Sequence, residues 1–340
     1  MARGGFTDLF ENHHFSIAYK MPAGTEGSDF FVRYENTARK TDWSLLWFRK
    51  VESLQPDPKR DWKDEHGRPY PNTAKVKTNY FELAVKKPVT YYLGTSFTTA
   101  VRQDRTIFLA TEEYSLKFDD ISSTWSISTA AATWNKLQPT LPFLYKGFRS
   151  RVVADLFKGF SQNTDGLYGI GADVEYHHPI YRHITAVGRF QAGHSGGSSK
   201  LLYNLGGIDN NLTVRTDSNV HFQQEAPYAF QTLVTPLRGH LQNSVYGNQY
   251  ALFNADVYFP IFQSLIPIET PLPSINLLQL GLFTDMAYAR ETWQPDSKGT
   301  SVWSYGLSAR TSLAGYPIRF DVAWPGKFVK PVWYLSLTTN

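Results

Sequence analysis

The sequence contains no cysteine and is poor in charge. None of the 340 residues is Cys and only 19% are charged, below the usual share of about a quarter. A cytosolic chain of this length usually carries a few thiols, so their absence favours an oxidising, extracytoplasmic compartment. The net charge is only +4 and the basic residues are scattered, which argues against a nucleic-acid partner.

Long hydrophobic runs are also missing. No apolar run approaches the roughly 20 residues that a membrane-spanning helix needs. A transmembrane β-barrel has no such runs, because its strands are apolar on one face only. The opening residues, Met-Ala-Arg-Gly-Gly-Phe, lack the apolar core of a signal peptide. An outer-membrane protein needs a signal peptide, so we expect that it was removed or that this chain is a piece of something longer.

Aromatic residues, by contrast, are abundant, at 15% of the chain, and many lie in segments that alternate between apolar and polar residues. Such alternation gives a strand one apolar face and one polar face. In 250–260, for example, Phe253 and Val257 share one face while Asn254 and Asp256 share the other. The same pattern occurs in 13–21, 30–34, 43–47, 81–85, 91–102, 112–119, 148–158, 167–178, 184–193, 277–289, 302–313, 316–324 and 333–339.

Two fold classes fit this alternation, a transmembrane barrel and a soluble β-sandwich or propeller. Many strands end their apolar face with Trp or Tyr, as the aromatic girdles of barrels do at the two membrane interfaces. The opposite faces carry Gly, Ser, Thr, Arg and Asp, which suit a wet lumen better than a packed core. The sequence therefore predicts an all-β chain in which residues 1–340 form one transmembrane antiparallel up-and-down β-barrel.

The lengths of the connections predict how the strands run. Barrel loops are long on the outer side and short on the periplasmic side. The connection 54–77 is long and polar, whereas 37–41 and 86–90 are tight turns, so the strand at 13–21 should run outward. This alternation of long outer and short periplasmic connections predicts that one N-terminal strand is missing from the chain or is supplied upstream. Residues 121–146 fit poorly, and we interpret them as an inserted excursion or an extra hairpin in a periplasmic connection.

Several segments from about residue 200 onward occur in the order found in one known family. Residues 202–207, Leu-Tyr-Asn-Leu-Gly-Gly, are similar to the opening of a long sixth outer loop, and 237–240, Leu-Arg-Gly-His, to its tip. The strands that follow have counterparts in 254–260, 281–285, 304–310 and 317–320. The chain thus resembles the bacterial surface antigen barrels, the BamA-type superfamily. Residues 203–260 and the opening Gly-Gly-Phe-Thr-Asp-Leu-Phe resemble, more specifically, barrels fused behind TolB-like propellers in Bacteroidetes.

The resemblance implies sixteen strands in the intact protein, with a sixth outer loop at about 196–249. Five strands follow this loop and eleven should precede it, of which we place ten, so about fifteen are visible. The family's periplasmic modules are absent from residues 1–340. At the loop tip, His240 stands where the family usually has Phe or Tyr.

The resemblance also implies that the sixth loop folds back into the lumen, where its tip meets acidic groups. The alternation independently places Asp256 and Asp285 on lumen faces of adjacent strands, where they would flank the guanidinium of Arg238. Gly239 would allow a tight turn, and Gly206 and Gly207 open the loop. The alternative is that Arg238 is solvated and both aspartates merely line a wet wall.

Other motifs give no catalytic or metal site. Residues 193–197, Gly-His-Ser-Gly-Gly, are similar to a serine protease motif but lack its Asp and its partner residues. His13-His14 and His177-His178 with His183 lack the spacing of a metal site, so no cofactor or metal is expected. No phosphate-binding or dinucleotide-binding glycine pattern occurs.

The sequence therefore predicts a protein that is not an enzyme. The resemblance implies a role in outer-membrane protein assembly or polypeptide translocation. The partners would be outer-membrane lipids, lipopolysaccharide, periplasmic or lipoprotein subunits, and client polypeptides. The alternatives are a structural barrel that anchors a periplasmic propeller or a surface lipoprotein, and a passive pore.

Overall fold

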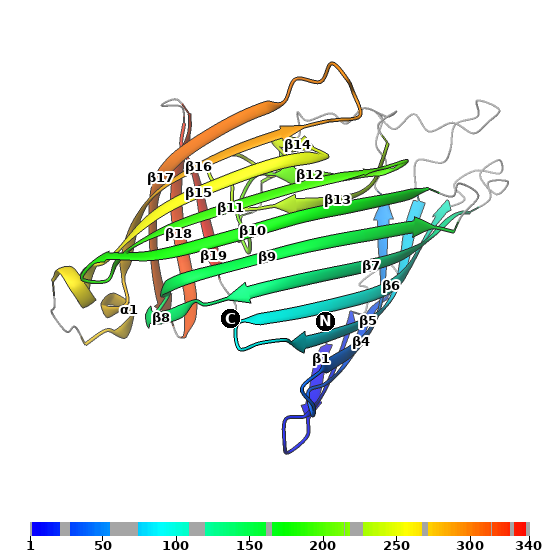
Figure 1. The fold of residues 1–340 in the computed structure, drawn as a ribbon, viewed down its shortest axis with the longest axis horizontal. Helices are drawn as coiled ribbons and strands as arrows, with labels where there is room; N and C mark the ends of the chain where they lie inside the picture. Colours follow the sequence, from blue (N-terminus) through cyan, green and yellow to red (C-terminus); the bar gives the residue numbers. More distant parts are fainter. Residues whose placement is uncertain are drawn as a thin grey trace. The chain divides into compact units, whose positions relative to one another are not determined.

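The computed structural model consists almost entirely of β-strands (Figure 1). It describes residues 2–20, 28–54, 74–108, 120–160, 165–213, 215–217, 227–266, 271–313, 315–326 and 330–337. Within these ranges the helical elements are a π-helical turn, Ile261–Leu265, and a short helix α1, Pro273–Asn276. None of the described helices has the length and apolar character to cross a bilayer.

The strands before the long loop are β1 Ala2–Thr7, β2 His13–Lys20, β3 Asp29–Asn36, β4 Asp42–Leu54, β5 Ala74–Pro88, β6 Leu93–Phe108, β7 Ile121–Asn135, β8 Gln138–Leu141, β9 Leu144–Gly159, β10 Gly166–Tyr181 and β11 Ile184–Gly197. Those within the loop are β12 Lys200–Leu205, β13 Tyr228–Val234 and β14 Val245–Gly247. Those after it are β15 Gln249–Pro260, β16 Gln279–Arg290, β17 Thr300–Leu313, β18 Tyr316–Pro325 and β19 Val332–Leu337.

The main sheet follows the chain order from β1 to β19, with β8 as a side branch of β9 and a jump from β11 to β15. Among the described strands, ten of this path precede the jump and five follow it. Every strand pair whose register is given along this path is antiparallel. This order confirms the expected up-and-down topology and the fifteen visible strands.

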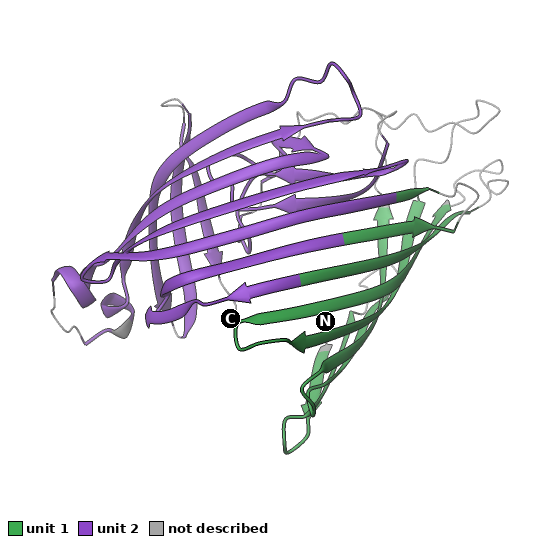
Figure 2. Cartoon of the chain, in the orientation of Figure 1, with its two compact units in different colours: residues 1–131, 155–166 green, residues 132–154, 167–340 purple. Residues whose placement is uncertain are grey.

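The chain divides into two compact units (Figure 2). The first comprises residues 1–131 and 155–166, and the second comprises residues 132–154 and 167–340. The first unit therefore holds β1 to β6, and the second holds β10, β11, the long loop and β15 to β19.

In the first unit, the strands β4, β5 and β6 have one apolar face and one polar face. Trp47, Phe81 and Val101 lie opposite one another in register, and each is about half exposed. On the other face of β5, the Tyr80 hydroxyl donates to Glu82 at 2.6 Å. The apolar side chains are therefore exposed on one face of the sheet, whereas the polar side chains hydrogen-bond to each other on the other face. Such a sheet can contact lipid with its apolar face.

The same alternation occurs in the second unit on β15 and β16. Leu252, Asn254 and Asp285 are 2% exposed or less, whereas Phe253 is 42% and Met286 54% exposed. Neighbouring positions along each strand therefore differ sharply in exposure, as the two-residue period of a strand requires. The buried face of this sheet is the one that carries the aspartates.

Residues 121–146 are not the long connection that the sequence suggested. They contain the strands β7 and β8 and the start of β9, so the turns between them are short. The pattern was missed because β7 reads Ile-Ser-Ser-Thr-Trp-Ser-Ile-Ser-Thr-Ala-Ala-Ala-Thr-Trp-Asn, whose small residues give a weak apolar alternation. The strand proposed at 112–119 lies outside the described residues.

The long loop between β11 and β15 contains a small sheet of its own, with the order β13-β12-β14. Strand β12 pairs with β13 in parallel and with β14 in antiparallel orientation. In addition, β12 contacts β11, and β14 contacts β16. This small sheet, which the sequence pattern did not reveal, anchors both ends of the segment that carries residues 235–242.

Candidate functional site at the loop tip

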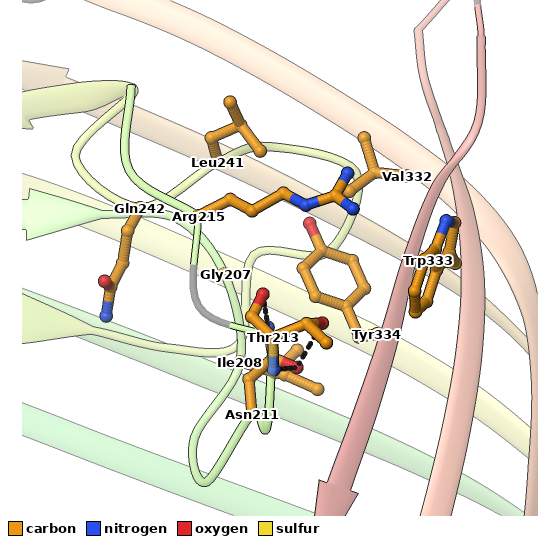
Figure 3. Close-up of a pocket in the computed structure, with 10 residues that line it drawn as sticks. All are labelled: Gly207, Ile208, Asn211, Thr213, Arg215, Leu241, Gln242, Val332, Trp333 and Tyr334. Atoms are coloured by element: carbon orange, nitrogen blue, oxygen red, sulfur yellow. Dashed lines mark hydrogen bonds between the residues drawn. The ribbon is translucent and has the colours of Figure 1, made fainter. Parts of the chain in front are cut away.

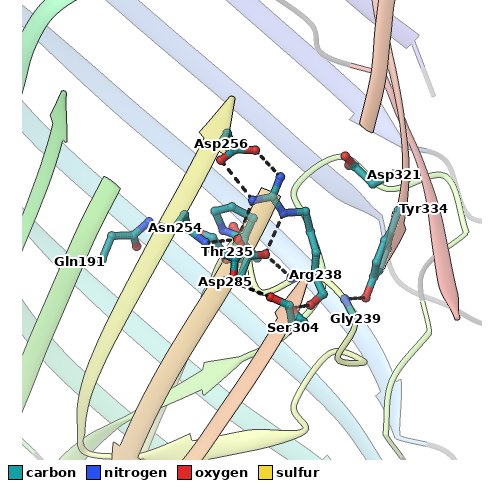
Figure 4. Close-up of polar contacts among 12 residues, drawn as sticks. Gln191, Thr235, Arg238, Gly239, Asn254, Asp256, Asp285, Ser304, Asp321 and Tyr334 are labelled. Atoms are coloured by element: carbon teal, nitrogen blue, oxygen red, sulfur yellow. Dashed lines mark hydrogen bonds and ion pairs between the residues drawn. The ribbon is translucent and has the colours of Figure 1, made fainter. Parts of the chain in front are cut away.

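Arg238 lies between two carboxylates of the main sheet (Figure 4). Its Nη1 and Nη2 donate to Asp256 at 2.6 and 3.2 Å. Its Nε and Nη2 donate to Asp285 at 2.7 and 2.5 Å, and its backbone N–H donates to the same carboxylate at 2.9 Å. Each carboxylate thus receives two guanidinium hydrogen bonds, the geometry for which the planar arginine fork is suited.

The register of β15 and β16 explains how the two carboxylates come together. Asn254 lies opposite Asp285, and Asp256 lies opposite Phe283, two residues away on the same face. The Asn254 amide donates to Asp285 at 2.8 Å and to the loop carbonyl of Pro236 at 2.9 Å. Without a cation between them, Asp256 and Asp285 would repel each other.

This group of charges is removed from solvent. The side chains of Arg238 and Asp285 are 0% exposed, and that of Asp256 is 10% exposed. Breaking a buried ion pair by removing one partner costs about 3–5 kcal/mol, because the remaining charge is left uncompensated. The arrangement is therefore stable only while the loop tip stays in place.

Gly239 makes the sharp turn that follows Arg238. Its φ is +85°, and a Cβ there would lie 2.9 Å from the Cβ of Ser304, so a side chain would be both strained and obstructed. The Gly239 N–H donates to the Tyr334 hydroxyl at 3.0 Å, and that hydroxyl donates to the His240 carbonyl at 2.9 Å. The last strand, β19, is thereby tied to the loop tip.

Gly206 and Gly207 pack against the same tip. A Cβ on Gly206 would lie 2.0 Å from the Leu241 carbonyl oxygen. Gly207 and Leu237 exchange backbone hydrogen bonds at 3.1 and 2.9 Å. All six residues singled out in the sequence, Arg238, Gly239, Asp256, Asp285, Gly206 and Gly207, are therefore brought together, and we call them with Tyr334 the loop-tip site.

Sequence reasoning missed several contributors to the loop-tip site. Phe283 stacks beneath the guanidinium of Arg238, the Ser304 hydroxyl donates to the Arg238 carbonyl, and Tyr334 bridges to β19. A second, partly buried ion pair, between Arg319 and Asp321 at 2.8 Å, lies beside Asp256. Each of these residues sits on the polar face of an alternating strand, which was the signal available in the sequence.

His240 follows the turn, with its Nε2 3.4 Å from the carbonyl oxygen of Trp303. Burial lowers the pKa of this imidazole, opposed by the Trp303 carbonyl and by the charge of Asp285. The docked loop tip therefore favours the neutral form of His240.

A second contact of the loop lies against β19, where loop and strand line a pocket (Figure 3). Asn211 forms an antiparallel bridge with Ser336. The Leu212 N–H donates to the Leu335 carbonyl at 2.8 Å, and the Leu337 N–H donates to the Asn210 carbonyl at 3.4 Å. These backbone groups of β19 point away from β18, so a three-residue stretch of the loop covers this edge of the strand.

The serine and histidine motifs noted in the sequence form hydrogen bonds with neighbouring residues. The Ser195 hydroxyl is buried, donates to the Leu201 carbonyl at 2.7 Å and accepts from the Leu201 N–H at 3.1 Å. His13 contacts the Tyr34 hydroxyl at 2.8 Å, and His177 contacts Glu175 at 2.5 Å. Within the described ranges, no three His, Asp or Glu side chains are grouped so as to hold a metal ion.

The fold is similar to that of several solved structures. BamA from Haemophilus ducreyi lacking POTRA domains 1–3 matches with a TM-score of 0.63 and 12% identity, over 96% of this chain and 64% of that one. CdiB from Acinetobacter baumannii matches with a TM-score of 0.50 and 12% identity, over 98% and 55%. CdiB from Escherichia coli matches with a TM-score of 0.51 and 10% identity, over 98% and 58%.

The chain therefore spans less than two thirds of each of these proteins. No curated protein sequence matches it. The Omp85 superfamily domain, however, matches residues 12–331, nearly the whole chain. The protein belongs to the Omp85 superfamily and has the transmembrane antiparallel up-and-down β-barrel fold.

Proposed function

We propose that this protein resides in a bacterial outer membrane and acts, without a catalytic centre, in outer-membrane protein assembly or polypeptide translocation. The observation that carries the proposal is the weakly covered edge of β19. Among the described residues, the loop covers it through one bridge at Asn211 and two flanking hydrogen bonds. An incoming extended segment that replaced the loop would recover those bonds, because strand edges bind any backbone in register.

In this proposal the loop-tip site pins the sixth loop, residues 196–249, inside a single barrel domain formed by residues 1–340. The Arg238 contacts hold residues 235–240 while the short stretch around Asn211 exchanges. Client handling would rest on upstream domains or on periplasmic or lipoprotein partners, since this chain spans only part of its structural neighbours. A Bacteroidetes origin remains a prediction.

The experiment is to lock the β19 edge with a disulfide. Because residues 1–340 contain no Cys, Asn211→Cys with Ser336→Cys introduces the only thiols within these residues. The flanking hydrogen bonds make this a non-hydrogen-bonded pair, with Cα atoms about 4.5 Å apart, within the range that disulfides span. The single variants Asn211→Cys and Ser336→Cys are the controls.

Each variant is made in the full natural chain and expressed in cells from which the wild-type protein has been depleted. We expect the oxidised double variant to lower the outer-membrane or secreted proteome as depletion does, and reductant to restore it. The single variants should behave as wild type. Unchanged proteomes on depletion would contradict assembly and translocation, and loss of one bound propeller or lipoprotein alone would identify an anchoring barrel. Loss of small-solute uptake as the sole effect of depletion would identify a pore.

A further inference from the structure

Three cationic side chains lie together on one face of β4, β5 and β6, in the first unit. Lys77 is directly opposite Arg105 across the β5–β6 pair and opposite Val51 across the β4–β5 pair. Arg49 lies on β4 two residues before Val51, opposite Asn79. Neighbouring strands are about 4.8 Å apart and residues along a strand about 3.3 Å apart, so the Cα of Lys77 lies about 5 Å from that of Arg105 and about 8 Å from that of Arg49.

These cations lie on the exposed face of the sheet, beyond the apolar band. Side chains an even number of residues apart on a strand share a face. Arg49 therefore shares its face with Trp47 on β4. Lys77 shares its face with Phe81 on β5, and Arg105 shares its face with Val101 on β6. Trp47 is 50% and Phe81 53% exposed. On this face, the row of three cations therefore lies beyond the apolar band formed by Trp47, Phe81 and Val101, with Asn79 between Phe81 and Lys77 and Gln103 between Val101 and Arg105.

The row stands at the ends of the strands that lead into residues 55–73 and 109–119. Both connections are long, and long connections belong to the outer side of such barrels. The cations therefore belong at the level of the outer-leaflet headgroups, with acyl chains alongside Trp47 and Phe81.

The described residues do not balance this charge. Arg105 pairs with Asp120, at 2.7 Å from its Nε, whereas no carboxylate of the described residues forms a salt bridge with Arg49 or Lys77. The Nε of Arg49 is buried and has no hydrogen-bond partner within the described ranges. Like charges directly opposite each other destabilise a sheet, so an external anion at this place would relieve a cost that the fold carries.

We propose that Arg49, Lys77 and Arg105 bind the phosphate group of an outer-leaflet lipid whose acyl chains pack on the aromatic band. A phosphate offers strong acceptor oxygens to several charged donors at once. The apolar band below the row selects a lipid over a free phosphate ion, because acyl chains bury apolar surface there. This site is independent of whether the protein handles client polypeptides.

The test uses purified full-length protein in neutral detergent, with bisphosphorylated lipid A as the probe and native mass spectrometry as the readout. The triple variant Arg49→Gln, Lys77→Gln and Arg105→Gln removes the charges. The matched control is Lys87→Gln, because Lys87 is an exposed cation on the same strand and face but at the opposite end. A heat-modifiable band on unboiled gels establishes that each variant is folded, and the single variant Lys77→Gln serves if the triple variant is not.

We expect the triple variant to bind lipid A at least about tenfold more weakly and Lys77→Gln about threefold, since exposed charge pairs contribute modestly each. Lys87→Gln should stay within about twofold of wild type. Lipid A stripped of both phosphates should bind wild type and triple variant equally. Equal lipid A binding by the triple variant, or an equal loss in Lys87→Gln, would overturn the site. Competition by inorganic phosphate at the lipid's own concentration would overturn the assignment to a lipid.

Discussion

The guanidinium carbon of Arg238 lies 3.6 Å from the centre of the Phe283 ring. The two carboxylates engage the edges of the guanidinium, so the ring supplies a third favourable surface, the electron-rich face of an aromatic. Across the β16–β17 pair, Phe283 is opposite Gly306. A Cβ on Gly306 would lie 2.4 Å from the Cζ of Phe283 and 2.2 Å from the Val322 carbonyl oxygen. The absence of a side chain at Gly306 therefore leaves the space that the ring occupies.

We predict that Gly306→Ala destabilises the barrel by about 1–3 kcal/mol, the usual cost of overpacking, because the ring must leave its place beneath Arg238. The measurement is the temperature at which the fast-migrating unboiled band is lost. Gly188→Ala is the control, since Gly188 is also within a strand but a Cβ there meets nothing within 4 Å. Equal transition temperatures for the two variants would contradict the steric argument.

Arg238→Ala should destabilise the docked loop by about 3–5 kcal/mol, because it leaves Asp256 and Asp285 buried without a counter-charge. Arg238→Lys should recover only part of this, since one ammonium group cannot replace the four fork contacts. Limited proteolysis between residues 206 and 248 reports on the loop. The control is Arg33→Ala, which removes a half-exposed ion pair with Glu35 worth about 0–1 kcal/mol. Unchanged cleavage in Arg238→Ala would refute the role of this contact as a lock.

Alternation in the sequence was sufficient to place Asp256 and Asp285 on one face, because a strand's period is two and does not depend on its neighbours. The register, which decides that Asp256 meets Phe283 and Asp285 meets Ser304, depends on turn lengths that the alternation does not contain. For this reason Phe283 and Ser304 were not assigned to the site.

The path of the long loop between β11 and β15 could not be predicted from the sequence pattern, for a different reason. Its strands β12, β13 and β14 are short, and the partners in the β12–β13 pair are separated by residues 206–227. No local periodicity marks a pairing of this kind. The bridge at Asn211 likewise joins residues that are far apart in the chain, so neither contact with β19 was predicted.

Tyr334→Phe should destabilise the docked loop tip by about 1–3 kcal/mol, because it leaves the buried Gly239 N–H without its hydrogen-bond partner. The His240 carbonyl still accepts from the Gly207 N–H at 2.9 Å. The temperature of band loss and the cleavage of the loop should change together. Tyr288→Phe is the control, since Tyr288 is a partly exposed residue on the apolar face of β16. If Tyr334→Phe affected neither measurement while Arg238→Ala affected both, the tie between β19 and the loop tip would be of no energetic consequence.

Docking of the loop tip should weaken in acid because of His240. Burial lowers the pKa of His240 in the docked state, so the undocked loop binds more protons and docking becomes more favourable as pH rises. This contribution is complete above the ordinary histidine pKa of about 6.5 and is lost progressively below it. Loop cleavage of wild type should therefore accelerate between pH 7.5 and 5.5 relative to His240→Phe, which cannot titrate. Parallel acceleration in both proteins would assign the effect to other groups, whereas a constant ratio above pH 7 that diverges in acid would assign it to His240.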